Sequence, residues 1–208
     1  MQIGPALHYG LLKTRAVLLL TLGRPLNALQ QFEKMLGLRP ADRHALASLA
    51  HLQAQLNHPE DAVHSLLQLT GIPGTTLQEA SAWFNLGYVQ QRLQRHEAAE
   101  SAFGKAVALA PGMDQAWYGL AIAHMQQQQF HEALKALQIN TALQPMSPYG
   151  WYRLAQVRLA LGQSQEARAV VAHLRRFEPQ VAAQLEREHA LGGPGADLPT
   201  SLAPDAAH

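Results

Sequence analysis

A self-similarity with a period of 34 residues is the feature that most limits how this chain can fold. Trp83, Trp117 and Trp151 lie 34 residues apart, and residues at fixed offsets from each Trp also match. A Leu follows three residues later, an Ala sixteen later and a Pro twenty-eight later. A fixed period of this length indicates a repeat architecture, in which each unit buries its apolar face against its neighbours.

The register continues towards the N-terminus with weaker matches. Leu12 and Leu46 stand where Trp stands later, and Gly74 stands where Pro is usual. The second repeat also carries three extra residues in its exit loop, around Gly71–Gly74. Five repeats result, at residues 9–42, 43–79, 80–113, 114–147 and 148–181.

Each repeat is predicted to form two antiparallel helices. Gly23 and Gly162 are expected to end first helices, because glycine tolerates positive φ. A Pro after each second helix prevents its continuation. The Ser147-Pro148 pair predicts a helix start, and Thr76-Leu77-Gln78-Glu79 has the form of a capping box. Acidic residues that suit the positive end of the helix dipole open the second helices, at Glu60, Asp61, Glu97, Glu132 and Glu166. Small residues are expected where the paired helices approach closely, at Gly87/Ala99, Ala121/Ala133 and Ala155/Ala167.

This pattern closely resembles the tetratricopeptide repeat (TPR), and the resemblance covers residues 9–181. It implies an all-α, right-handed solenoid of five tandem helix-turn-helix repeats, with a concave groove lined mainly by the first helices. The pattern of Val181–Leu191 predicts an amphipathic capping helix at residues 182–191. Residues 1–8 are expected to be an N-terminal extension, and residues 192–208 a disordered tail.

Composition excludes several classes of function. The chain has no Cys, which removes disulfides, thiol catalysis and Cys-ligated metals. A net charge of +1 argues against unselective binding to nucleic acid. No apolar run is long enough for a membrane span. The apolar segment after Lys13 and Arg15 is explained by the first repeat rather than by a signal peptide, so a cytoplasmic location is expected.

Neither catalysis nor metal binding is predicted. The repeats leave no room for a separate catalytic domain, and no phosphate loop, nucleophile elbow or paired-histidine motif is present. His44 and His51 share one helix face, but seven residues correspond to about 10 Å along the axis, too far to share one ion. We therefore expect a non-enzymatic protein without a cofactor or a metal.

Family positions that tend to face the concave side identify a candidate peptide-binding groove. Aromatic rings there suit side chains of a ligand, and amide and guanidinium groups suit its backbone carbonyls. Arg92 and Arg153 have no predicted acidic neighbour in the groove, so the ligand should be neutral or acidic. The candidates are His44, His51, Phe84, Asn85, Tyr88, Arg92, Tyr118, Ile122, Met125, Tyr149, Tyr152, Arg153 and Gln156.

One familiar TPR subtype does not fit. Co-chaperone domains hold a C-terminal carboxylate with Lys and Asn residues at fixed positions of three repeats. Of those positions only Lys13 matches when the first three repeats are compared, and only Asn85 when the comparison starts one repeat later. A chaperone C-terminus is therefore not the expected ligand.

The leading interpretation is an adaptor that binds a protein segment in this groove. Two alternatives remain: a regulatory or targeting portion of a larger enzyme such as a transferase fusion, and a self-assembling scaffold. The self-assembling alternative rests on Leu11, Leu18 and Leu22. In later repeats the face that meets the preceding repeat carries Ala82 and Val89, Ala116 and Ala123, or Gly150 and Val157, and the three leucines are larger and no more polar. We expect this face to be covered, either by a second copy in a homodimer or by further repeats.

Overall fold

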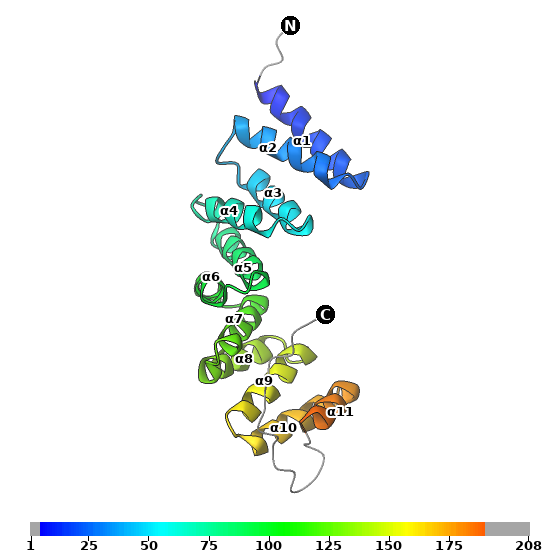
Figure 1. The fold of residues 1–208 in the computed structure, drawn as a ribbon, viewed down its shortest axis with the longest axis vertical. Helices are drawn as coiled ribbons and strands as arrows, with labels where there is room; N and C mark the ends of the chain where they lie inside the picture. The colour runs from blue at the N-terminus through cyan, green and yellow to red at the C-terminus, as the bar shows by residue number, and fades with distance from the viewer. Residues whose placement is uncertain (1–4, 190–208) are drawn as a thin grey trace. The chain divides into compact units, whose positions relative to one another are not determined.

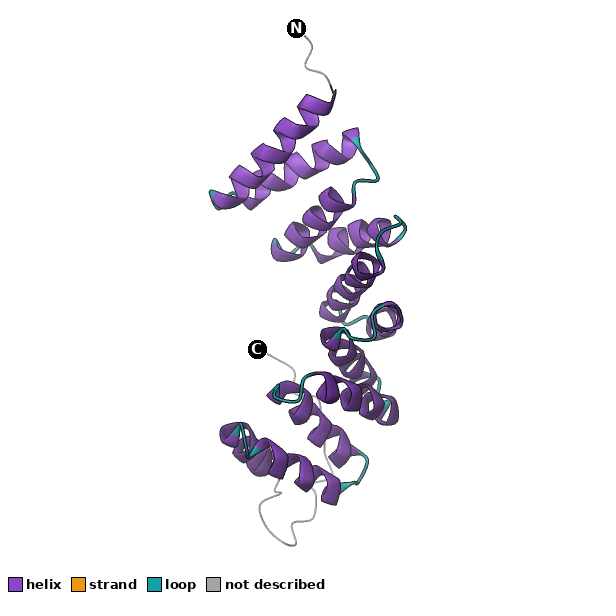
Figure 2. Cartoon of the chain, turned by 180° about the vertical axis from the view of Figure 1, so that it is seen from behind, coloured by secondary structure: helices purple, strands orange, loops and turns teal. Residues whose placement is uncertain are grey.

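A computed structural model describes residues 5–189 of the chain, and within this range every regular element is an α-helix (Figures 1 and 2). The chain divides into two compact units, unit 1 at Met1–Gln127 and unit 2 at Gln128–His208. The division falls between the two helices of the fourth predicted repeat. Unit 1 holds α1 (Pro5–Thr21), α2 (Pro25–Leu38), α3 (Arg43–Gln55), α4 (Pro59–Thr70), α5 (Thr76–Arg92), α6 (His96–Leu109) and α7 (Asp114–Gln126). Unit 2 holds α8 (Phe130–Leu143), α9 (Pro148–Ala160), α10 (Ser164–Leu174) and α11 (Pro179–Glu188).

The predicted all-α fold of repeated helix pairs is confirmed. In unit 1 each helix packs on the next, from α1 to α7. Its core includes one cluster of buried residues centred on Phe32 and Met35 between α1, α2 and α3, and another centred on Leu46, Leu66 and Leu86 between α3, α4, α5 and α6. In unit 2, α9 packs on α8, α10 and α11. None of the described helices is long and apolar enough to cross a membrane.

The turn inside each helix pair uses one residue with positive φ. Gly23 and Gly162 take this conformation, at φ 65° and 73°, as the sequence predicts. Asn57, Gln94 and Gln128 take the same place in the other repeats, at φ 62°, 58° and 59°. A side chain at such a φ costs roughly 1–2 kcal/mol except for asparagine, which tolerates it, so the turns at Gln94 and Gln128 are formed against local preference.

The helix ends differ from the predictions in three places. The capping box uses Thr75 and Gln78 rather than Thr76 and Glu79, because α5 begins one residue earlier. The first helix begins at Pro5, inside the predicted extension. The last helix is Pro179–Glu188 rather than 182–191, and Pro179 opens it instead of ending α10, since proline needs no N–H donor at a first helical position. Residues 190–208, including the predicted tail, lie outside the described range.

A polar contact fixes α1 to the start of α3. The Tyr9 hydroxyl donates to the carboxylate of Asp42, the N-cap of α3, which also accepts from the backbone N–H of Ala45 at 2.8 Å. Burial, with the negative charge of Asp42 beside it, raises the pKa of Tyr9 to about 12. Burial alone would raise the pKa of Asp42, but these hydrogen bonds hold it below 3.8. The guanidinium of Arg39 lies 4.2 Å from the centre of the Tyr9 ring.

Glycine at two helix positions admits a large ring. Phe103 on α6 is almost fully buried, and its ring lies against Gly87 on α5 and Gly119 on α7. A Cβ added at Gly87 would come within 2.8 Å of the ring, and one at Gly119 within 2.6 Å. Both distances are shorter than real carbon contacts, so three helices meet at Phe103 only because both residues are glycine.

The repeated Trp has a repeated contact. The indole N–H of Trp117 donates to the Pro111 carbonyl at 2.8 Å, and that of Trp151 donates to the Pro145 carbonyl at 2.8 Å. Each bond joins a first helix to the loop before it. The position six residues before Trp83 lies inside α5, which begins at Thr76, so no loop carbonyl is available there. The Lys105 ammonium lies 3.9 Å from the centre of the Trp83 ring.

Arg43 fixes that longer loop. Its guanidinium donates to the carbonyls of Leu69, at 3.3 Å, and Ile72, where α4 ends. Arg43 also lies against Gly74, where a Cβ would come within 2.7 Å of the guanidinium. The three-residue insertion is thus held by a side chain of the same repeat.

Candidate functional site

Unit 1 contains a pocket of about 370 Å³ between α3 and α5. Three alanines of α3 leave the space open, and Leu66 of α4 and Val89 of α5 contribute apolar surface. Larger side chains of α5 and the polar end of α3 complete the lining: His51, Gln55, Phe84, Asn85, Tyr88 and Arg92. The pocket thus combines apolar surface with several hydrogen-bonding groups, as ligand sites commonly do.

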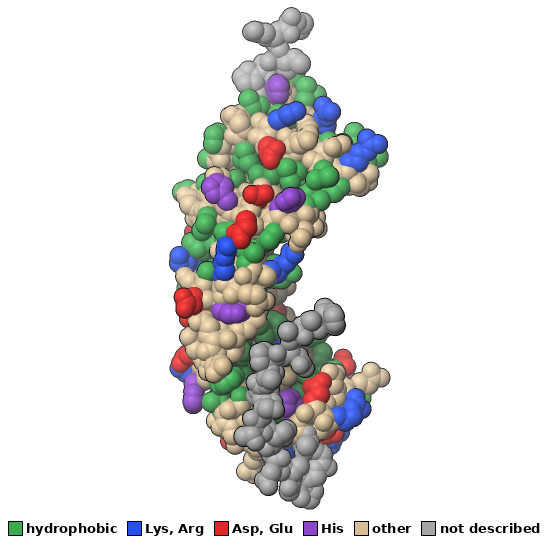
Figure 3. All heavy atoms as spheres, in the orientation of Figure 1, with side chains coloured by type: hydrophobic (Ala, Val, Ile, Leu, Met, Phe, Trp, Pro, Cys, Tyr) green, Lys and Arg blue, Asp and Glu red, His purple; other side chains and the backbone are tan. Residues whose placement is uncertain are grey.

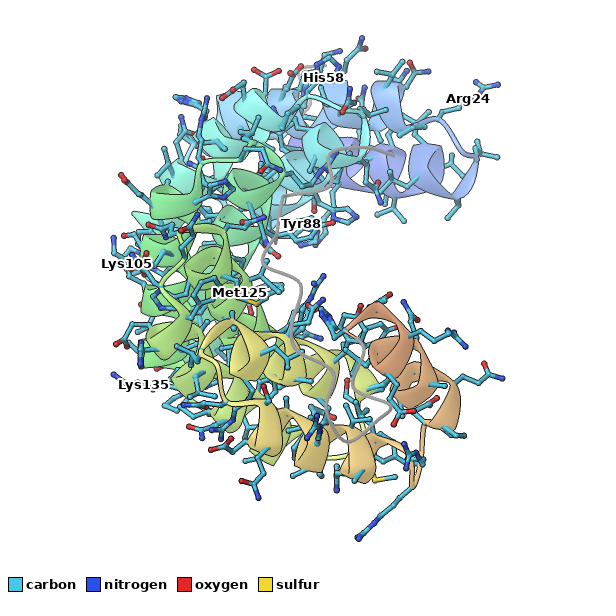
Figure 4. All side chains as sticks on the ribbon, turned by 60° about the horizontal axis from the view of Figure 1, so that its bottom comes forward. Arg24, His58, Tyr88, Lys105, Met125 and Lys135 are labelled. Carbon is cyan, nitrogen blue, oxygen red and sulfur yellow. The ribbon has the colours of Figure 1, made fainter. Side chains whose placement is uncertain are left out.

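Periodicity explains why the α5 side chains gather. Phe84, Tyr88 and Arg92 are four residues apart, so they lie along one face of the helix. Tyr88 is exposed, and Figure 4 shows it projecting from the opposite side of the α5–α6 pair to Lys105. An exposed ring at the edge of a pocket offers contact area at a low cost in conformational entropy.

Contacts behind the lining hold two of these residues. The rings of Phe84 and Phe103 are 5.8 Å apart, so Phe84 is supported by the buried core. One guanidinium nitrogen of Arg92 donates to the Ala54 carbonyl at 3.1 Å, which joins the C-terminal ends of α5 and α3. A guanidinium has five N–H donors, so this bond leaves further donors of Arg92 for a ligand.

The charge of the pocket is positive. Arg92 is a permanent cation, and the His51 ring adds hydrogen-bonding nitrogens without a negative charge. The described residues that line the pocket include neither Asp nor Glu. A neutral or negatively charged ligand group would therefore meet favourable electrostatics here.

Five of the thirteen predicted groove residues line this pocket, namely His51, Phe84, Asn85, Tyr88 and Arg92. His44 is exposed in the first turn of α3, outside the lining. Tyr118, Ile122 and Met125 are partly buried on α7, and they too lie outside it.

The other four predicted groove residues belong to α9 in unit 2. Tyr149 is 71% exposed. The Tyr152 hydroxyl donates to the Glu188 carboxylate, and burial together with this bond raises the pKa of Tyr152 to about 12. Arg153 donates to Gln156 at 2.8 Å. The acidic Glu188 on α11 was not foreseen beside the predicted groove residues, so unit 2 gives less support for an acidic ligand than unit 1.

Several pocket residues were not predicted. Gln55 adds an amide group, whereas Ala47, Ala50 and Ala54 on α3, with Leu66 and Val89, line the pocket but have no polar side chain. The one available signal was the spacing of small residues on α3, since Ala47, Ala50 and Ala54 recur every three or four residues. Among residues 5–189, no three His, Asp or Glu side chains gather as metal ligands would.

The candidate self-association face is open in the structure. Leu11, Leu18 and Leu22 are 52%, 57% and 60% exposed. Leu7, four residues before Leu11, is also 62% exposed, and Ile3 lies outside the described residues. Hydrophobic side chains are visible at this end of unit 1 in Figure 3. The expectation that the face is covered stays a prediction.

The repeated turns, the repeated Trp contact and the helix pairs define a class of helical-repeat protein. Two tetratricopeptide repeat family models match the chain, over residues 48–114 and 92–151, and together they span half of it. The chain belongs to the tetratricopeptide repeat family. A search of curated proteins gave no match.

Solved structures with the same fold share little sequence with this chain. A MamA protein crystal structure is 19% identical, with a TM-score of 0.74 over 91% of this chain and 98% of that one. YrrB, described as a TPR protein with an unusual peptide-binding site, is 16% identical, with a TM-score of 0.72 over 83% and 88%. PilF of Pseudomonas aeruginosa is 18% identical, with a TM-score of 0.65 over 92% and 96%. At these identities the likeness establishes the fold alone.

Proposed function

We propose that this protein is a non-enzymatic adaptor that binds a peptide or protein segment in the pocket between α3 and α5. The observation that carries the proposal is that five residues chosen from the sequence as groove candidates line one pocket of about 370 Å³. Membership of a family of protein-interaction repeats supports the same class of function, and YrrB gives a peptide-binding precedent on this fold.

The lining suggests the chemistry of the ligand. The alanines of α3 with Leu66 and Val89 offer room for one bulky apolar side chain, and the exposed ring of Tyr88 can pack against it. Asn85 can donate to and accept from a peptide backbone, and Arg92 favours a carboxylate or carbonyl oxygen nearby. The expected ligand is therefore a segment with an apolar anchor residue and a neutral or acidic neighbour.

The test is selection of peptides from a random display library on the full chain, followed by measurement of their dissociation constants. The Asn85→Ala/Tyr88→Ala variant should weaken binding at least tenfold, because a truncated aromatic anchor typically costs about 2 kcal/mol or more. A matched control is Leu77→Ala/Ser101→Ala, which removes one apolar and one polar exposed side chain of the same unit outside the pocket. The control should bind like the wild type.

Charge preference is tested by Arg92→Glu. This variant should lose acidic peptides and retain or gain basic ones. If the groove and control variants bind the selected peptides equally well, or if no peptide is selected, the assignment of the pocket as the binding site is wrong.

A further inference from the structure

Helix α1 carries a stripe of leucines that the described residues of unit 1 leave exposed. Leu7, Leu11, Leu18 and Leu22 are all more than half exposed. Their spacings of four, seven and four residues place them on one face, on the side of α1 opposite to the buried Tyr9, Leu12 and Ala16. Leu22 directly follows the last residue of α1, and its N–H donates to the Leu18 carbonyl at 3.0 Å, so it stays in line with the helix. We call these four residues the leucine stripe.

Later repeats show what this face normally meets. The positions equivalent to Leu11 are Ala45, Ala82 and Ala116, and each is at most 1% exposed. The positions equivalent to Leu18 are Leu52, Val89 and Ala123, and each is at most 3% exposed. The helices that carry them pack on the preceding helix, as α3 does on α2, α5 on α4 and α7 on α6. The middle of the stripe, Leu11 and Leu18, therefore lies where this architecture receives a neighbouring helix, and Leu7 and Leu22 extend it at either end.

The order of the stripe indicates which helix that neighbour is. Spacings of four, seven and four read the same in both directions. If a second copy of α1 lies antiparallel, Leu7 faces Leu22 of the second copy and Leu11 faces Leu18, and the reciprocal pairs form as well. A two-fold interface requires this kind of self-complementary surface. A helix from an unrelated partner would need no such symmetry.

We propose that two copies of the chain associate through antiparallel packing of their α1 helices along the leucine stripe. Four half-exposed leucines from each copy give a few hundred Å² of apolar surface per side, the size of a functional patch on a monomer. Two such surfaces reach roughly the 1,000 Å² that a specific but weak interface needs. The midpoint of the stripe lies between Thr14 and Arg15. The two Arg15 side chains of the dimer lie near each other there, and their repulsion limits the strength of the dimer.

The first experiment measures the mass of the full chain by light scattering and sedimentation across a concentration series. The wild type should pass from monomer to dimer. Leu11→Glu/Leu18→Glu should weaken association at least tenfold without changing the thermal melting of the monomer, because both side chains are mostly exposed. The matched control is Leu67→Glu/Leu77→Glu, which adds two charges at exposed leucines on α4 and α5; it should dimerise like the wild type.

The second experiment tests the antiparallel arrangement and uses the absence of Cys from the chain. A disulfide requires Cα atoms within about 7 Å. The Thr14→Cys variant sits at the midpoint and should cross-link to itself under mild oxidation. The Leu22→Cys variant should not, because its two copies would lie roughly 20 Å apart along the axis. A mixture of Leu7→Cys and Leu22→Cys chains should instead form a mixed disulfide.

Three outcomes would overturn the proposal. The wild type could remain monomeric at all concentrations, or the stripe and control variants could dimerise equally well. Alternatively, Leu22→Cys could cross-link to itself while the mixture with Leu7→Cys does not, which indicates parallel packing. A dimer that is sensitive to the stripe and shows the predicted cross-links supports it, whether or not the pocket between α3 and α5 binds a peptide.

Discussion

Gly119→Ala should destabilise the protein, although alanine is the better helix former. In an open helix interior this change stabilises by about 1 kcal/mol. Here the new Cβ would lie 2.6 Å from two atoms of the Phe103 ring. Phe103 is 1% exposed, and its ring cannot move away freely because Gly87 on α5 also lies against it. Overpacking of this kind costs about 1–3 kcal/mol, so the net effect should be a loss of about 0–2 kcal/mol.

The same helix bundle offers a matched control. Gly104 lies inside α6, next to Phe103 in sequence, and a Cβ there would meet nothing within 4 Å. Gly104→Ala should therefore gain about 1 kcal/mol from helix propensity. The free energies of unfolding of the two variants should differ by about 1–3 kcal/mol. Relative to the wild type, Gly104→Ala should raise this free energy and Gly119→Ala should lower it or leave it unchanged. Urea unfolding followed by circular dichroism can resolve this difference.

A third variant isolates the contact. Leucine at position 103 lacks the planar ring that meets Gly119, so in a Phe103→Leu background the Gly119→Ala change should become neutral or stabilising. A double-mutant cycle should give a coupling of about 1–3 kcal/mol between the two positions. If Gly119→Ala is as stabilising as Gly104→Ala in the wild type, or if the cycle shows no coupling, the steric argument fails.

Three more predictions concern single contacts of unit 1. Gln94→Gly should raise the melting temperature, since it removes the strain of φ 58°, less the extra chain entropy of glycine; an unchanged or lower value would contradict the strain. Tyr9→Phe should flatten the pH dependence of stability at both ends. The raised pKa of Tyr9, about 12, contributes stability below pH 10 that is lost as the pH rises. The lowered pKa of Asp42 contributes stability above about pH 4 that is lost as the pH falls. Denaturant titrations from pH 3 to pH 11 would check this, and parallel profiles for wild type and variant would count against it. Glu60→Gln removes the negative charge and one of the two acceptors that Arg95 contacts at 2.7 and 2.9 Å. It should change the free energy of unfolding by less than about 1 kcal/mol, because both groups are exposed; a larger loss would mean that the pair is not screened by solvent.

The sequence predicted the helices well because periodicity reports directly on buried faces. The 34-residue register placed Gly23 and Gly162 in their turns, and it also placed the acidic first turns of α4, α6, α8 and α10. It failed where one residue decides the outcome. Pro179 could end one helix or open the next, and only packing against α9 and α10 selects the second role.

The sequence predicted the aromatic and most polar lining residues of the pocket but not its small and apolar ones. Aromatic and polar residues such as Tyr88 and Asn85 attract attention because their chemistry is visible in the sequence. Ala47 and Ala54 act by being small, and a small residue looks the same whether it admits a ligand or a neighbouring helix. The predicted line of groove residues also ran on to Tyr149 and Tyr152, but the division of the chain into two units was not visible in a uniform repeat.

The repeated Trp residues provide built-in optical reporters. Trp117 belongs to unit 1 and Trp151 to unit 2, and each indole N–H donates to a proline carbonyl at 2.8 Å. The ring of Trp151 also lies 4.4 Å from that of His173, so the intensities of the two signals are not comparable, but the midpoints of their unfolding transitions are. A chain with only Trp117 and a chain with only Trp151 would therefore show directly whether the two units lose structure together or one after the other.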